Sequence, residues 1–228
     1  MVKSPAARKT PALIELAAAY ASALAVIFLF KGVGAGVPSI KRELPFIAAA
    51  VFMTIPLIMI KLRGQSLSDY GMRTRAPVYE LTFALVAMLA VFPLFGTGYH
   101  IWQKFFLQHP PVFRLPANLP YLIAAHFLLV ALPEEFFYRG YMQGTLKRIF
   151  PGGARIAGAT VGPAILITSA LFALGHFLLD PRPMRLGVFF PSLLFGWMKE
   201  RTGSITAPVI FHAMSNILMV ILERSYLG

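Results

Sequence analysis

Long apolar stretches recur along the whole chain, and they constrain its fold more than any other feature of the sequence. A hydrocarbon core about 30 Å thick needs about 20 residues of helix to cross it. Seven stretches are candidates for such spans: residues 12–30, 44–60, 80–99, 119–146, 161–179, 185–199 and 204–222. The sixth stretch is short and contains Pro191. We therefore predict an all-α fold, a polytopic membrane helical bundle of about seven (six to eight) transmembrane helices.

The composition favours the same class of protein. Hydrophobic residues make up 57% of the chain and charged residues 13%, whereas soluble domains have roughly 45–50% and about 25%. The absence of Cys excludes disulfides, a thiol nucleophile and Cys-ligated metal sites. The net charge of +12 comes from Lys and Arg placed between apolar stretches. This placement favours membrane lipid as a partner and no nucleic acid.

The basic residues also predict how the chain lies in the membrane. Lys3, Arg8 and Lys9 precede a first apolar stretch that is longer than the apolar core of a usual signal peptide, so we expect a retained signal-anchor helix. Lys and Arg outside the spans are in excess on the side of the N-terminus, which predicts a cytoplasmic N-terminus. We expect a multi-pass integral protein of the cytoplasmic (inner) membrane of a bacterium.

Three charged residues lie inside the fourth stretch, although a charge at the bilayer centre costs about 2.5–3.5 kcal/mol on insertion scales. Glu135 and Arg139 are four residues apart, so they share one helix face and can form an ion pair. Glu134 points about 100° away from that face and has no cation at this spacing. An ion pair that only fixes helix packing would not explain Glu134. This carboxylate is therefore a candidate general acid or base.

Polar residues in two later stretches are candidates to meet Glu134 in one intramembrane polar cavity. The fifth stretch contains His176, and the seventh contains His212 with Asn216 four residues later on the same face. Glu134 and His176 could activate a water molecule. His212 and Asn216 could donate hydrogen bonds to the oxyanion of a tetrahedral intermediate. Alternatively, Glu134, His176 and His212 could ligate a catalytic zinc ion, although the H-E-x-x-H spacing is absent.

The same residues resemble the signature of a known family. The segment Glu134–Arg139 matches an EExxxR motif, Phe172–His176 matches FxxxH, and His212–Asn216 matches HxxxN. In this order, and each in an apolar stretch, they are similar to the CAAX-processing and bacteriocin-processing (CPBP) intramembrane proteases, also called the Abi or Rce1-like family. We therefore divide the chain into residues 1–118, with the first three spans, and residues 119–228, with the catalytic helices.

The resemblance implies a glutamate-dependent endopeptidase that hydrolyses peptide bonds near the membrane. By resemblance, the catalytic residues are Glu134, His176, His212 and Asn216, and the supporting residues are Glu135 and Arg139. The implied substrate is a peptide or protein with a membrane-proximal cleavage site, such as a C-terminal tail, an anchored peptide or a maturing protein. No cofactor is favoured, and zinc stays the alternative. The sequence does not indicate an oligomeric state.

Two other classes of protein fit part of the pattern. A non-catalytic membrane-binding or bacteriocin-immunity protein would keep the pocket without activity, so its cellular role would survive Glu134→Ala. A haem or ion-translocating membrane subunit would use His176 and His212 as axial ligands or relay groups. This second alternative explains neither Glu134 nor the pairing of Glu135 with Arg139.

Overall fold

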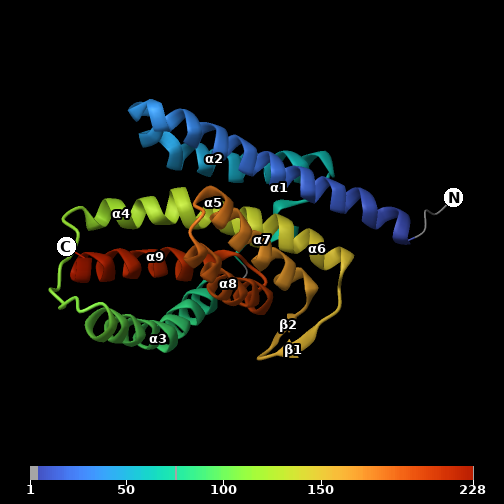
Figure 1. The fold of residues 1–228 in the computed structure, drawn as a ribbon. Helices are drawn as coiled ribbons and strands as arrows, with labels where there is room; N and C mark the ends of the chain where they lie inside the picture. The colour runs from blue at the N-terminus through green and yellow to red at the C-terminus, as the bar shows by residue number, and fades with distance from the viewer. Residues whose placement is uncertain (1–4, 75, 228) are drawn as a thin grey trace.

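A computed structural model describes residues 5–74 and 76–227, and most of these residues are helical (Figure 1). Lys3, part of the N-terminal basic signal, lies outside the described residues. The elements in chain order, with η for 3₁₀ and π segments, are α1 (Pro5–Gly36), α2 (Pro38–Leu62), 3₁₀ η1 (Leu67–Tyr70), α3 (Pro77–Ile101), π η2 (Trp102–Phe106), α4 (Leu119–Ala125), π η3 (His126–Ala131), α5 (Leu132–Glu135), π η4 (Phe136–Gln143), α6 (Gly144–Ile149), β1 (Ala154–Ile156), β2 (Ala159–Val161), α7 (Pro163–Leu179), 3₁₀ η5 (Pro183–Val188), α8 (Phe189–Thr202) and α9 (Thr206–Leu227).

The polytopic helical fold predicted from the sequence is confirmed. Within the described residues, five helical stretches are long and apolar enough to cross a membrane: Thr10–Gly36, Pro38–Leu62, Pro77–Phe106, Leu119–Ile149 and Thr206–Leu227. The helices at the predicted fifth and sixth spans are shorter, because α7 has 17 residues and α8 has 14. The bundle therefore combines five full-length spans with two short helices, and the two short helices are neighbours that pack on each other.

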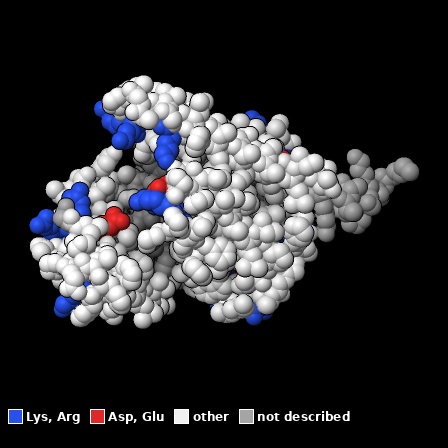
Figure 2. Space-filling view, in the orientation of Figure 1, with Lys and Arg blue, Asp and Glu red and all other residues white. Residues whose placement is uncertain are grey.

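Uncharged side chains cover most of the face of the molecule drawn in Figure 2. Many large apolar side chains are exposed on the helices, for example Phe28 and Leu29 on α1 and Leu89 and Leu94 on α3. An exposed apolar surface of this extent is expected where lipid is the solvent. Lys and Arg gather with a few acidic side chains around a hollow near the end where α1 meets α2 (Figure 2).

Proline and glycine set several helix boundaries. Pro38, Pro77 and Pro163 occupy the first positions of α2, α3 and α7. A missing N–H costs nothing at a first helical position, and the fixed φ of proline suits the helix. Gly203 ends α8 with φ 75°, in the left-handed region that glycine adopts without a steric penalty. These local signals place the helix ends independently of how the helices pack.

The fourth span is not a uniform α-helix. It starts as α4, widens to a π-helix in η3, returns to α-helix in α5 and widens again in η4. Glu134 and Glu135 lie on the short α-helical turn between the two wide segments. All eight residues of η4 are buried. Because π segments inside helices occur mostly at functional sites, this irregularity singles out the fourth span.

The fourth span lies at the centre of the bundle. The α1–α2 hairpin covers one side of it, and α9 and α3 lie on the other side (Figure 1). The short helix α7 also packs on η4. The short strands β1 and β2 form an antiparallel hairpin between α6 and α7, which the sequence analysis did not predict. The central span thus contacts helices from both the N-terminal and the C-terminal parts of the chain.

A polar contact inside the bundle fixes the first hairpin against the central span. The Glu15 carboxylate on α1 lies 2.8 Å from Nη2 of Arg63, which directly follows α2. The Tyr141 hydroxyl on η4 donates a hydrogen bond of 2.8 Å to the same carboxylate. Both charged side chains are about four-fifths buried. Glu15 therefore joins three segments that are far apart in the sequence.

We expect Glu15→Gln to lower the free energy of unfolding by about 1–2 kcal/mol, because the amide keeps an acceptor for Tyr141 but loses the charge that Arg63 faces. The measurement is thermal unfolding of the purified protein in detergent. Glu43→Gln is the matched control, since the ion pair between Glu43 and Arg42 is largely exposed and should contribute little. Equal melting temperatures for Glu15→Gln and the wild type would contradict the assignment.

Candidate active site

Glu135 is the centre of a charged cluster inside the bundle, and its side chain is fully buried. Its Oε2 lies 3.2 Å from Nε of Arg139, so the ion pair expected from the four-residue spacing is present. Its Oε1 accepts a hydrogen bond of 2.8 Å from Nδ1 of His212. Because a carboxylate accepts, the proton of this bond is on the histidine. Glu135 therefore links the fourth span to α9.

Arg139 extends the same cluster to α8. Its Nη2 donates to Oγ of Ser192 at 2.8 Å and to the Ser192 carbonyl at 3.3 Å. The guanidinium carbon lies 4.5 Å from the ring centroid of Phe172 and 5.0 Å from that of Phe195. Aromatic faces attract a guanidinium, which partly compensates for its removal from water. Arg139 is thus held by a carboxylate, a serine and two rings.

Glu134 has a different environment from its neighbour. Its Oε2 is buried and has no hydrogen-bond partner among the described residues. The nearest cationic candidate is Nε2 of His212 at 3.9 Å, which is beyond hydrogen-bond distance. Leaving a buried carboxylate oxygen without a partner is costly, so such a group is more typical of chemistry than of packing. The two adjacent glutamates therefore have separate roles, as their angular separation on the helix predicts.

His176 and Glu134 line the same cavity, which has a volume of about 180 Å³. The residues lining it are Phe52, Glu134, Tyr138, Gly175, His176, Leu179, Asp180 and Arg185. Nδ1 of His176 donates a hydrogen bond of 2.9 Å to the Phe172 carbonyl, since a carbonyl only accepts. The neutral ring therefore carries its lone pair on Nε2. A carboxylate residue and an imidazole residue thus line one cavity, and these are the side-chain types that can deprotonate water.

His212 lies between the two carboxylates and two aromatic rings. Its ring stacks on Phe195 with centroids 4.8 Å apart, and it makes an edge-to-face contact with Phe172, with centroids 6.1 Å apart. With Nδ1 donating to Glu135, His212 can donate from Nε2 only when both ring nitrogens are protonated. Its position is therefore fixed by packing and by one hydrogen bond.

Asn216 is half-buried one turn after His212 on α9, as the HxxxN spacing predicts. Neither His212 nor Asn216 is among the residues that line the cavity of Glu134 and His176. The structure thus brings Glu134, Glu135, Arg139 and His212 into one cluster, and it connects Glu134 to His176 through the cavity.

The zinc alternative depends on a suitable set of ligands. Among the residues that the structure describes, no group of three or more His, Cys, Asp or Glu side chains could hold a metal ion. The zinc alternative with Glu134, His176 and His212 therefore stays a prediction, to be tested by metal content. In both histidines the Nδ1 atom is already used in a hydrogen bond within the protein.

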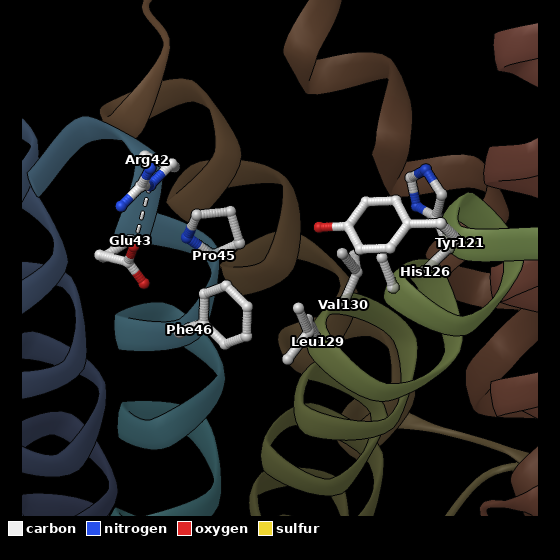
Figure 3. A pocket seen from close by; sticks show the side chains of 9 residues that line it. Arg42, Glu43, Pro45, Phe46, Tyr121, His126, Leu129 and Val130 are labelled. Carbon is white, nitrogen blue, oxygen red and sulfur yellow. Dashed lines mark hydrogen bonds and ion pairs between the residues drawn. The ribbon is translucent and has the colours of Figure 1, made fainter. Parts of the chain in front are cut away.

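A second cavity, of about 390 Å³, lies between α2 and the start of the fourth span (Figure 3). Figure 3 shows Arg42 and Phe46 of α2 on one side, and Tyr121 and His126 of the fourth span on the other. His126 interacts electrostatically with Glu134 and with His212. Its ring Nδ1 is buried without a hydrogen-bond partner in the described part of the chain. The second cavity is therefore lined by a histidine that is close enough to Glu134 and His212 to interact with them electrostatically.

Sequence reasoning missed Ser192 and Phe195, which hold Arg139 and His212 from α8. The one signal for Ser192 is that it is a polar residue within a short apolar stretch. Phe195 gives no signal, because it is one of 20 phenylalanines in the chain. Both contacts join residues of the fourth span or α9 to α8, and no local pattern predicts them.

The fold and the cluster define a multi-pass membrane protein with a carboxylate–histidine site inside its helical bundle. The family model described as type II CAAX prenyl endopeptidase Rce1-like matches residues 116–218, which include Glu134, His176 and His212. This match supports the resemblance to the Rce1-like family that the three motifs indicate. In general terms, the match supports an intramembrane endopeptidase of the CAAX type. The searches of curated proteins and of solved structures gave no match.

We expect Arg139→Ala to cost about 3–5 kcal/mol of stability, because it leaves the Glu135 carboxylate buried without its cation. Combining Arg139→Ala with Glu135→Gln should recover part of this loss, since glutamine is neutral and still accepts from His212. A double-mutant cycle measured by thermal unfolding in detergent gives the coupling energy. Additive effects of the two substitutions would show that the pair is not coupled.

Proposed function

We propose that the chain is a glutamic-type intramembrane endopeptidase that hydrolyses peptide bonds close to the membrane. The observation that carries this proposal is the cavity shared by Glu134 and His176, each with an acceptor atom not used in the protein's own hydrogen bonds. A water molecule between these two acceptors would donate both of its hydrogens. Its lone pairs would then face the carbonyl carbon of a bound peptide.

In the proposed reaction, Glu134 removes a proton from water while the oxygen of that water attacks the carbonyl carbon. The carbonyl becomes a tetrahedral oxyanion. The C–N bond then breaks as the nitrogen receives a proton from Glu134, directly or through Nε2 of His176, and leaves as an amine. The two residues are regenerated in their starting protonation states, and one water molecule is consumed for each bond.

From the resemblance of His212 and Asn216 to the HxxxN motif, we assign the oxyanion to these two residues; they do not line the cavity, but Nε2 of His212 lies 3.9 Å from Oε2 of Glu134. His212 serves in its doubly protonated form, in which Nε2 carries a donor. Together with Arg139, a protonated His212 would neutralise the two carboxylates of the cluster. Donors fixed before the reaction stabilise a developing charge most effectively, because they need no reorganisation. Glu135 and Arg139 then act as supporting residues: Glu135 orients His212, and Arg139 compensates the charge of Glu135.

The proposal includes no resident metal and no other cofactor. The substrate is a peptide or protein with a cleavage site near the membrane, such as a C-terminal tail or an anchored peptide. We place the protein in the cytoplasmic membrane of a bacterium, with its N-terminus in the cytoplasm. The excess of Lys and Arg on the N-terminal side of the spans supports this orientation.

We expect Glu134→Gln to abolish peptide hydrolysis, by about 10²–10⁴-fold or more, because an amide cannot accept the proton of water. The measurement is cleavage of a membrane-anchored peptide library by purified protein in detergent or nanodiscs. The matched control is Glu43→Gln, a substitution at the rim of the second cavity that should leave the rate unchanged. Unchanged hydrolysis by Glu134→Gln would contradict the proposed general base.

Metal content and cellular phenotype separate the remaining alternatives. Wild-type activity that survives exhaustive chelation supports water activation by Glu134 and His176 alone. One zinc ion per chain that is lost together with activity in Glu134→Gln would show a metalloprotease instead. A cellular role that survives Glu134→Ala would indicate a non-catalytic binding or immunity protein.

A further inference from the structure

The helix α7, which carries His176, stops inside the bundle. We call the two ends of the bundle the N end, where α1 begins, and the C end, where α9 ends (Figure 1). The helix α7 starts at the N end, directly after the β1–β2 hairpin, and its 17 residues extend about 25 Å. The neighbouring fourth span has 31 residues, which extend about 45 Å. The helix α7 therefore ends well before the C end.

The rim of the catalytic cavity is formed where α7 stops. Leu179, Asp180 and Arg185, which end or follow this helix, line the cavity. Lys31, close to the end of α1 and so to the C end, donates to the Leu179 carbonyl. The hollow in Figure 2 lies at this same end. On the other side of Glu134, all eight residues of η4 are buried. The cavity is thus accessible from the C end, and the packed η4 segment separates it from the N end.

The loops at each end are the same whether or not α7 and α8 count as spans. The helix α8 returns the chain to the N end, where Ile205 donates a hydrogen bond of 3.0 Å to the Gly71 carbonyl in the segment after α2. The helix α9 then crosses to the C end, where the Val112 amide in the segment after α3 donates to the Ser225 carbonyl at 2.7 Å. The two short helices therefore enter and leave the bundle on the same side.

Basic residues are concentrated at the N end. Within the described parts of the chain, ten Lys and Arg residues lie at the N end and six at the C end. Arg182 and Arg185 belong to neither group, because they follow the short α7 inside the bundle and pair with Asp180. Loops rich in Lys and Arg stay in the cytoplasm, which favours a cytoplasmic N end. The residues counted are Arg8, Lys9, Lys61, Arg63, Arg73, Lys147, Arg148, Arg155, Lys199 and Arg201 at the N end, and Lys31, Lys41, Arg42, Lys104, Arg114 and Arg224 at the C end.

Resting on the proposed function and its orientation, we propose that the catalytic cavity opens to the extracytoplasmic side of the membrane. The substrates are then exported or membrane-anchored polypeptides whose cleavage site lies outside the cytoplasm. A cleavage site presented at the cytoplasmic surface would be separated from Glu134 by the buried η4 segment.

Single cysteines test this orientation directly, because the chain contains no Cys and needs no cysteine-free background. Met184→Cys reports on the rim of the cavity, since Met184 lies in η5 between the two arginines and is 88% exposed. Ser39→Cys reports on the C end and Ala154→Cys on the N end, and both residues are exposed. Each variant is treated with a membrane-impermeant maleimide, first on intact spheroplasts and then after permeabilisation.

We expect Met184→Cys and Ser39→Cys to be labelled on intact spheroplasts, and Ala154→Cys only after permeabilisation. The wild type gives the background. The reverse pattern, or labelling of all three variants on intact spheroplasts, overturns the inference and leaves the proposed function intact. Labelling of Met184→Cys only together with Ala154→Cys, or under neither condition, also overturns it. Gly187→Cys, where an added Cβ meets no atom within 4 Å, replaces Met184→Cys if that variant does not accumulate.

Two fusion substrates test the substrate class. Both carry one sequence that the purified protein cleaves in detergent, placed on the extracytoplasmic side of a single span in one fusion and on the cytoplasmic side in the other. We expect cleavage of the extracytoplasmic fusion alone, and its loss with Glu134→Gln. Cleavage of the cytoplasmic fusion, or of neither fusion, overturns the inference. If the purified protein cleaves no peptide, the proposed function fails, whereas the labelling pattern still decides the side to which the cavity opens.

Discussion

The two bonds made by the buried Glu135 carboxylate are the interaction on which the rest of the site depends. One oxygen faces Arg139 and the other accepts from His212, so a single side chain sets the distance between the fourth span and α9. Arg139 in turn reaches Ser192 on α8. An ion pair inside a bundle is expensive unless every member has partners. The shared contacts meet that condition only in part, because Oε2 of Glu135 and Nη1 of Arg139 are buried without a hydrogen-bond partner among the described residues. They leave Glu134 as the carboxylate that is not engaged in holding the helices together.

Much of this arrangement could be predicted from residue spacing alone. The apolar stretches predict the helices, the i, i+4 spacing predicts the pair of Glu135 with Arg139, and the angular step between adjacent residues predicts that Glu134 faces elsewhere. The three motifs also indicated the family whose model matches residues 116–218. These inferences succeed because each depends on geometry within one helix or on a local composition.

Other features could not be predicted, because they depend on contacts between distant segments. The hydrogen bond from His212 to Glu135 joins residues 77 positions apart, and the spacing of Glu135 indicated only Arg139 as its partner. Glu15 likewise contacts Arg63 and Tyr141, which lie 48 and 126 positions away in the sequence. The hydropathy of the fifth and sixth stretches placed α7 and α8 along the chain, but it could not indicate that these two short helices pack on each other.

The π-helical form of η4 makes the site sensitive to the length of the chain. A wide turn accommodates one more residue than an α-helical turn, because its hydrogen bonds connect residues five apart instead of four. If one residue were deleted between Phe136 and Gln143, the segment could close into a regular α-helix. Each residue of an α-helix turns by about 100°, so the side chains on the two sides of the deletion would then face different neighbours. Through this stretch, homologous chains are therefore constrained in residue number as well as in residue type, and gaps in their alignments should fall elsewhere.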